Sequence, residues 1–199
     1  TVYGGVTSTN VLTVNASAVL NAASSTINLL GTGTPFVING TFNYNTSTVV
    51  YSGATANIAS TTYYNLTANN GTAGTLTGST TVSSVLTVNA SMVLNGGTSS
   101  VVTLLGTGTP FLLNGSFVAN TSNFTFSGAT ASIASTTYYN LTINNGTSGN
   151  LTGSTTVSSV LTINASKVLN AGTSQVTLSG TGTPFVKAGD FTASTSNFI

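Results

Sequence analysis

Apolar and polar residues alternate along this chain in short runs that are separated by turn residues. Near the N-terminus, Leu12, Val14 and Ala16 fall on one side of such a run, and Thr13 and Asn15 fall on the other. Period-two alternation with threonine on the polar side predicts a half-buried β-strand. The same pattern predicts strands at 26–30, 48–52, 63–68, 85–90, 101–105, 123–127, 138–143, 160–165 and 175–179. No stretch has the spacing of an amphipathic helix, so we expect helix content near zero.

These runs belong to an array of repeats. The segment TTYYNLTANNGTAGTLTGSTTVSSVLTVNAS, which begins at Thr61, recurs almost unchanged from Thr136 as TTYYNLTINNGTSGNLTGSTTVSSVLTINAS. The word GTGTPF begins at Gly31, Gly106 and Gly180, which gives a period of about 75 residues. We expect one continuous array with repeat 1 at 1–81, truncated at its N-terminal side, repeat 2 at 82–156 and a partial repeat 3 at 157–199. Since the sequence begins and stops inside repeats, we also expect a longer polypeptide.

The repeats predict an all-β fold, for which two architectures fit. One is a parallel β-solenoid, or β-helix, with eight to ten coils of about 20 to 25 residues each. The other is a row of tandem, Ig-like β-sandwich modules, each closing its own core. The absence of a polar or proline-rich linker between repeats favours the solenoid. The spacing of Leu141, Leu161, Val176 and Phe191 also favours it, because it suggests one face of successive coils.

Two kinds of residue pair recur within the repeats. Asn-Gly follows the GTGTPF word at Asn39-Gly40 and again at Asn114-Gly115. Because both residues accept a positive φ at low cost, these pairs predict tight turns. The other pair is Tyr-Tyr, at residues 63–64 and 138–139, where alternation places one ring in the core and one outside.

The composition is polar but almost uncharged. Thr, Ser and Asn make up 91 of the 199 residues, whereas charged residues make up 2% and the net charge is +1. This charge offers no attraction to nucleic acid or to anionic membranes, which call for clustered Lys and Arg. It also removes the repulsion that keeps soluble proteins apart, so self-association is favoured. No apolar run approaches the length of a transmembrane helix.

The chain lacks the side chains of most catalytic and metal sites. It has no His, Cys or Glu, and its one acidic residue is Asp190. A catalytic triad, a pair of catalytic carboxylates and a His/Cys metal site are therefore excluded within this segment. Calcium-binding repeat solenoids need rows of Asp and are excluded for the same reason. We expect neither enzymatic activity nor a cofactor.

The segment from Thr136 to Ser166 resembles the repeats of large bacterial surface and secreted β-helix proteins, with their recurring YNLTI and LTIN phrasing. Filamentous-haemagglutinin-like adhesins and autotransporter passenger domains are the familiar examples. The resemblance covers nearly the whole chain. It implies a long fibre or stalk outside a prokaryotic cell, so we expect an extracellular or cell-surface location.

A few residues are candidates for contacts with other molecules. The outward tyrosines Tyr64 and Tyr139 could pack against a neighbouring chain or a sugar. Lys187 and Asp190, both in the third repeat, are candidate contacts between subunits. Many Asn-x-Ser/Thr sequons occur, and four of them are candidate glycosylation sites: Asn65, Asn70, Asn140 and Asn145.

We expect a non-catalytic structural protein that assembles with copies of itself into a filament, stalk or surface layer. The alternative is a module of an adhesin or fibre that binds glycans or a cell surface. A minor alternative is ice binding, since the GTGTP words contain Thr-x-Thr pairs such as Thr32 and Thr34. These pairs recur only once per repeat.

Overall fold

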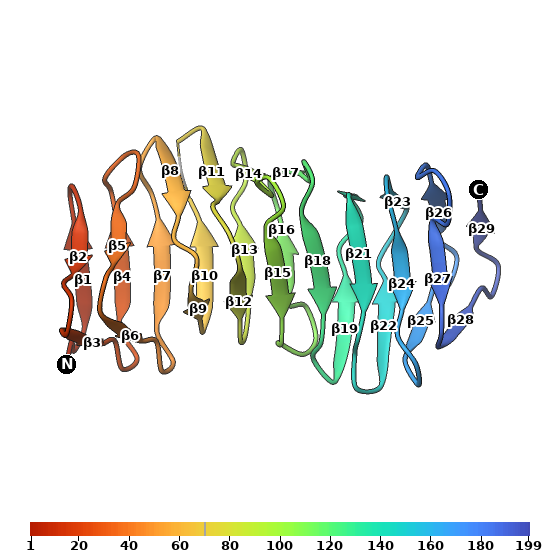
Figure 1. Cartoon of the computed structure of the whole chain (residues 1–199), viewed down its shortest axis with the longest axis horizontal. Coiled ribbons are helices and arrows are strands. Elements are labelled where there is room, and N and C mark those ends of the chain that lie inside the picture. The colour runs from red at the N-terminus through yellow and green to blue at the C-terminus, as the bar shows by residue number, and fades with distance from the viewer. Residues whose placement is uncertain (70) are drawn as a thin grey trace.

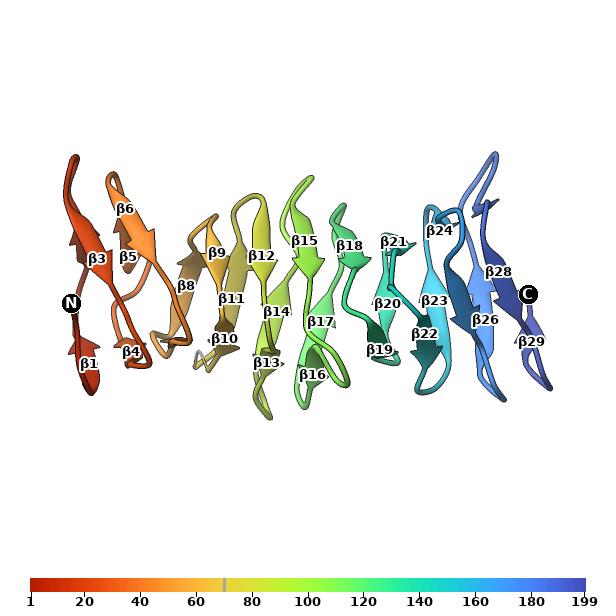
Figure 2. The same cartoon turned by 90° about the horizontal axis from the view of Figure 1, so that it is seen from below.

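The protein is a rod of stacked β-strands. The computed structural model describes residues 1–69 and 71–199, and in that part of the chain all regular elements are strands. The two termini lie at opposite ends of the rod, and a second view at right angles shows the same stack of coils (Figures 1 and 2). The chain makes about nine turns. The predicted all-β parallel β-solenoid is therefore confirmed.

Each coil contains three strands, and nearly every strand pairs in parallel with the strand three places further along the chain. The rod thus has three faces. Face one consists of β1 (Gly5–Ser8), β4 (Thr26–Leu29), β7 (Thr48–Tyr51), β10 (Asn65–Ala68), β13 (Leu86–Val88), β16 (Phe111–Leu113), β19 (Thr130–Ile133), β22 (Ser148–Leu151), β25 (Val168–Asn170) and β28 (Asp190–Thr192). Face two consists of β2 (Leu12–Val14), β5 (Phe36–Ile38), β8 (Thr55–Ile58), β11 (Ala73–Leu76), β14 (Val93–Asn95), β17 (Ser116–Val118), β20 (Thr137–Tyr138), β23 (Thr155–Val157), β26 (Gln175–Leu178) and β29 (Asn197–Phe198). Face three consists of β3 (Val19–Asn21), β6 (Thr41–Asn43), β9 (Thr62–Tyr63), β12 (Thr80–Val82), β15 (Val101–Leu104), β18 (Asn123–Phe126), β21 (Asn140–Ile143), β24 (Leu161–Ile163) and β27 (Phe185–Lys187).

Separate sandwich modules are not supported by this topology. A sandwich of antiparallel strands would close a core within each repeat, whereas here the buried residues form one cluster along the rod. The repeat limits expected from the sequence, between residues 81 and 82 and between 156 and 157, fall inside β12 and β23. The repeat is therefore a unit of sequence that does not coincide with a unit of folding.

One repeat does not contain a whole number of coils. Equivalent strands of successive repeats, such as β2, β13 and β24, are eleven strands apart, and eleven strands are three full coils plus two strands. As a result β2 lies on face two, β13 on face one and β24 on face three. Each repeat is rotated by a third of a turn from the one before it, so a feature that occurs once per repeat points in three directions along the rod.

Coil length varies within each repeat. Leu86 lies opposite Phe111 across a long coil, whereas Phe124 lies opposite Leu141 across a much shorter one. For this reason a steady spacing of apolar residues does not follow one face. The expectation that Leu141, Leu161, Val176 and Phe191 share a face is wrong beyond its first pair. Leu141 does pair with Leu161, but Val176 lies on face two opposite Phe198, and Phe191 lies on face one opposite Leu169.

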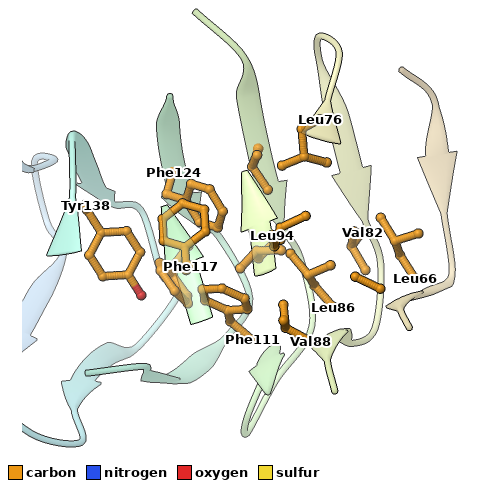
Figure 3. Close-up of a cluster of buried hydrophobic side chains, with 14 of the residues drawn as sticks. Leu66, Leu76, Val82, Leu86, Val88, Leu94, Phe111, Phe117, Phe124 and Tyr138 are labelled. Carbon is orange, nitrogen blue, oxygen red and sulfur yellow. The ribbon is translucent and has the colours of Figure 1, made fainter. Parts of the chain in front are cut away.

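Inward residues of very different size fill the core. Within the coil that runs from Val102 to Phe124, the rings of Phe111 and Phe117 lie inside the rod, and the centroids of Phe117 and Phe124 are 4.8 Å apart (Figure 3). The coil that runs from Ala131 to Gly149 is shorter. Both residues are buried, and a Cβ at Gly149 would lie 2.8 Å from Cδ1 of Ile133. Glycine is therefore needed at this inward position, where a larger residue would collide with Ile133.

The outward residues stack on residues of the same type. Thr67 lies opposite Thr87, and the amide nitrogen of Asn170 donates a hydrogen bond to the side-chain oxygen of Asn150 at 2.8 Å. The same bond joins Asn43 to Asn21 at 2.6 Å. Such cross-strand pairs each stabilise a sheet by about 0.2 to 1 kcal/mol, so many of them add up along the rod.

Two details of the predicted strands and turns are wrong. The strands expected over 63–68 and 138–143 are broken by corners at Tyr64 and Tyr139. Tyr63 ends β9 on face three and Asn65 starts β10 on face one, while Tyr138 ends β20 on face two and Asn140 starts β21 on face three. Neither Asn39-Gly40 nor Asn114-Gly115 has a positive φ. Their glycines are needed for another reason, because a Cβ at either one would collide with carbonyl oxygens of the preceding coil.

Positive φ occurs at other corners, including one where the residue type changes between repeats. Ala23 has φ of 50°, and the equivalent residues Gly97 and Gly172 have φ of 75° and 58°. A left-handed conformation is strained for alanine but not for glycine. We therefore expect Ala23→Gly to raise the free energy of unfolding by about 1 kcal/mol, measured by chemical denaturation.

The matched control is Gly172→Ala, where nothing lies within 4 Å of the added Cβ and only the φ opposes the change. It should lower the free energy of unfolding by about 1 kcal/mol. Equal effects of the same sign in the two variants would contradict this account of the corner.

Candidate interaction surfaces

The surface of the rod offers hydroxyl and amide groups and very little charge. Lys167, Lys187 and Asp190 are the charged side chains, and all three lie in the last quarter of the chain. Within residues 1–69 and 71–199 no three His, Cys, Asp or Glu side chains gather into a possible metal site. In the same part of the chain no helix is long and apolar enough to cross a membrane.

A column of six threonines runs along face three. In register from β9 to β24 it comprises Thr62, Thr81, Thr103, Thr125, Thr142 and Thr162. Adjacent strands are about 4.8 Å apart, so the column is roughly 24 Å long. Each threonine is half-buried by its neighbours above and below. The sequence alone gives no signal for this column, because its members are separated by irregular numbers of residues and two of them, Thr62 and Thr81, follow another threonine.

Asparagines flank the column. Asn140 donates to the side-chain oxygen of Asn123 at 2.6 Å, and Asn164 donates to that of Asn144 at 3.0 Å. Asn140 also accepts a hydrogen bond from the backbone of Val160 at 3.0 Å. The side chains on this part of face three are therefore held in fixed orientations without any charge.

The structure separates the tyrosines and charged residues that the sequence singled out. As predicted, Tyr63 and Tyr138 are fully buried, while their neighbours Tyr64 and Tyr139 are half-exposed. Because of the rotation between repeats, Tyr64 follows a strand of face three and Tyr139 follows one of face two. Lys187 ends β27 on face three, and Asp190 begins β28 on face one; both are exposed. These four residues do not form one cluster.

The candidate glycosylation sites differ in accessibility. Asn145 is fully buried, and its amide nitrogen donates to the carbonyl oxygen of Gly128 at 3.0 Å. Asn65 and Asn140 are half-buried, and the side-chain amide of Asn65 contacts the hydroxyl of Thr48 at 3.3 Å. Asn70 lies outside the described residues. In the folded rod these three described amides are therefore already engaged with the neighbouring coil.

An open groove marks the step from a long coil to a short one. After the GTGTP word, β16 does not pair with β19, and on this side of the rod the two coils are joined by the bridge between Gly108 and Ala131. The groove left between the strands has a volume of about 270 Å³. It is lined by hydroxyl-bearing and apolar residues: Thr109, Phe111, Leu112, Leu113, Ser132, Ala134, Ser135 and Thr152.

The first repeat has a side-chain bridge at the equivalent place. There Asn57 donates to the hydroxyl of Thr34 at 3.3 Å. In the second repeat the equivalent residues are Ser132 and Thr109, and serine is too short to make the same bond. The side chain at this position beside the groove is therefore shorter in repeat 2 than in repeat 1.

Buried tyrosines donate hydrogen bonds to the backbone at Ala59 in repeat 1 and at Ala134 in repeat 2, and Ala134 lines the groove. In repeat 1 the hydroxyls of Tyr51 and Tyr63 are 2.9 Å apart, and Tyr63 donates to the carbonyl oxygen of Ala59 at 2.8 Å. The backbone of Ala59 donates to Tyr51 at 3.0 Å. Since Tyr63 has one proton to donate, Tyr51 donates to Tyr63, and the three bonds close a ring. In repeat 2 Phe126 replaces Tyr51, and only the bond from Tyr138 to Ala134 is present, at 3.0 Å.

Burial keeps these phenols protonated. Loss of solvation raises the pKa of Tyr51 to about 12. Its hydrogen bonds to Tyr63 and Ala59 act in the other direction and lower the pKa by a smaller amount. Burial also raises the pKa of Tyr63 and of Tyr138 well above the usual value. An ionised phenolate inside the rod would be a buried charge without a partner.

No protein-family model matches the chain, and no curated protein or solved structure matches it either.

The buried tyrosines predict alkaline destabilisation. An unfolded tyrosine loses its proton near pH 10, whereas folded Tyr51 keeps its proton up to about pH 12. Between these values the unfolded state binds fewer protons, so the free energy of unfolding should fall by up to about 1.4 kcal/mol per pH unit for each such tyrosine. Tyr51→Phe, which installs the residue that repeat 2 has, should make the fall between pH 10 and 12 shallower. Denaturant titrations at each pH would measure it, and an unchanged slope would contradict the assignment.

Proposed function

We propose that this chain is a non-catalytic structural segment of an extracellular filament, stalk or surface layer that assembles from copies of itself. The observation that carries the proposal is the unbroken solenoid core, which passes through the repeat limits inside β12 and β23. Such a core makes a stiff rod whose length scales with the number of repeats, which suits a spacer or a filament.

The surface supports the same proposal. Rods that carry many like charges repel one another, whereas these faces are covered by stacked Thr and Asn with almost no charge. The resemblance of the repeats to bacterial surface and secreted β-helix proteins fits a prokaryotic, extracellular or cell-surface location. In this proposal the principal partner is another copy of the chain.

The proposal predicts that the purified chain forms rods that associate side by side. A single chain of about nine turns is roughly 45 Å long. Electron microscopy should show bundles of such rods, and fibre diffraction should show a reflection near 4.8 Å along the rod axis. Because the faces are uncharged, the sedimented fraction should change less than about twofold between 0.01 M and 1 M ionic strength.

A pair of variants on the threonine column tests the role of charge. Thr125→Lys combined with Thr142→Lys places two like charges on face three, so bundles should form only at high salt. The matched control combines Thr125→Lys with Thr142→Glu, which adds no net charge and should still assemble at low salt. A wild-type chain that stays monomeric at every concentration tested would contradict the proposed function.

A second candidate function is glycan binding by an adhesin or fibre module, and the groove between β16 and β19 favours it. Its uncharged lining combines hydroxyls such as those of Thr109 and Ser132 with the apolar side chains of Leu112 and Leu113. This combination suits a neutral sugar, whose ring has polar edges and apolar faces. Ice binding remains a minor alternative, since the threonine column on face three is one residue wide and is flanked mainly by Asn and Ser.

The groove predicts an effect of Ser132→Asn. The longer side chain should bridge to Thr109, as Asn57 does to Thr34, and fill the groove. Binding to an array of neutral oligosaccharides should then fall about tenfold, a loss of about 1.4 kcal/mol. Asn57→Ser is the reciprocal variant and should add binding in repeat 1. Equal binding by wild type and Ser132→Asn would rule the groove out as the glycan site.

A further inference from the structure

The three charged side chains of the chain lie at one corner of the rod. Lys187 and Asp190 stand on the two sides of the turn that joins β27 to β28, and Lys167 lies in the turn that joins β24 to β25. Because β27 pairs with β24 and β28 with β25, one turn is stacked on the other near the C-terminal end (Figure 1). The backbone N–H of Asp190 donates to the carbonyl oxygen of Lys167 at 2.7 Å. We call these three residues the charged corner.

The charges are confined to repeat 3. The positions equivalent to Lys167, Lys187 and Asp190 are Ala18, Ile38 and Thr41 in repeat 1, and Met92, Leu113 and Ser116 in repeat 2. The same backbone hydrogen bond stacks the turns there, from Thr41 to Ala18 at 2.9 Å and from Ser116 to Met92 at 2.8 Å. The corner therefore folds in the same way with and without charges, so its fold does not require them.

The charged corner carries both signs next to each other. Lys187 and Asp190 are exposed, so the rod covers neither charge. An anionic ligand would meet the carboxylate of Asp190, and a cationic ligand would meet two ammonium groups. A second copy of the corner instead offers a carboxylate to a lysine and a lysine to a carboxylate. The corner is thus complementary to itself.

We propose that two copies of this chain meet at the charged corner around a two-fold axis parallel to the rods. This inference rests on the proposed function, because it names the contact that aligns neighbouring rods. Lys187 and Asp190 lie on opposite sides of one turn, and the axis exchanges the two sides. Lys187 of each copy then lies opposite Asp190 of the other. The two rods run parallel, with no axial stagger.

The contact selects an alignment and adds little affinity. Exposed ion pairs are weak, whereas complementary charges fix the orientation in which two surfaces meet. The uncharged faces supply most of the attraction between rods. The amount of protein that sediments is therefore nearly independent of salt, while the alignment of neighbouring rods is lost when salt screens the corner.

A single cysteine can report this alignment, because the chain has none of its own. Ala188 is exposed and lies between Lys187 and Asp190, so Ala188→Cys places a thiol near the proposed axis. Oxidation of the assembled protein at low salt should give disulfide-linked dimers. The matched control is Asn114→Cys, at the equivalent exposed position of the uncharged corner in repeat 2. Its dimer yield should be about tenfold lower.

Charge reversal separates this contact from a stabilising role within the rod. In the Ala188→Cys chain, Lys187→Glu alone or Asp190→Lys alone places like charges opposite each other, and the dimer yield at low salt should fall about tenfold. The two reversals in one chain should restore the yield. An equimolar mixture of the two single variants should restore it as well, with each dimer containing one chain of each kind. The unfolding temperature should match that of the wild type throughout.

The outcomes distinguish this inference from the proposed function. If the wild type forms bundles but the two cysteine positions give equal dimer yields, or the reversals change nothing, the charged corner is overturned and the proposed function stands. If the double reversal and the mixture both stay at the low yield of the single variants, the reciprocal pairing is likewise overturned. If the wild type forms no bundles, both are overturned.

Discussion

The parallel pairing of strands three places apart in the chain is the interaction on which the rest of this structure depends. It satisfies the backbone groups of the inner strands on both sides, and it sets like residues over one another at the spacing of a sheet. Stacked leucines such as Leu66 and Leu86 then form the core, and stacked asparagines such as Asn150 and Asn170 form hydrogen bonds outside it. A chain with almost no charge can be stable in this arrangement because its polar groups bond to each other.

The mismatch between repeat and coil governs how the rod meets other molecules. Eleven strands per repeat on a three-strand coil turn each repeat by a third of a revolution, so Tyr64 and Tyr139 belong to different faces despite their identical sequence context. A flat array of one repeated side chain along a single face therefore does not arise from the repeat itself. The threonine column on face three instead combines different positions of the repeat, such as Thr81 and Thr103.

The positions that differ between repeats are therefore the most informative about function. The core positions hardly change in character, but repeat 2 replaces Asn57 by Ser132 beside the groove and Asn43 by the exposed Val118. Both changes alter the surface while the strands keep their places. Repeat 2 therefore exposes different side chains from the repeats on either side of it, although its strands are arranged in the same way.

The sequence by itself determined the all-β class, the repeat, the preference for a solenoid and the absence of His, Cys and Glu. Alternation within short runs and turn residues between them are local signals, and residues such as Leu12 and Val14 show them without any partner. The burial of Tyr63 and Tyr138 also followed from alternation. Only the tertiary structure decided which strands lie together, because register depends on coil length, and coil length differs from one coil to the next. That variation is why Val176 and Phe191 fall on different faces from Leu161, and why the threonine column and the groove emerge only when the coils are stacked.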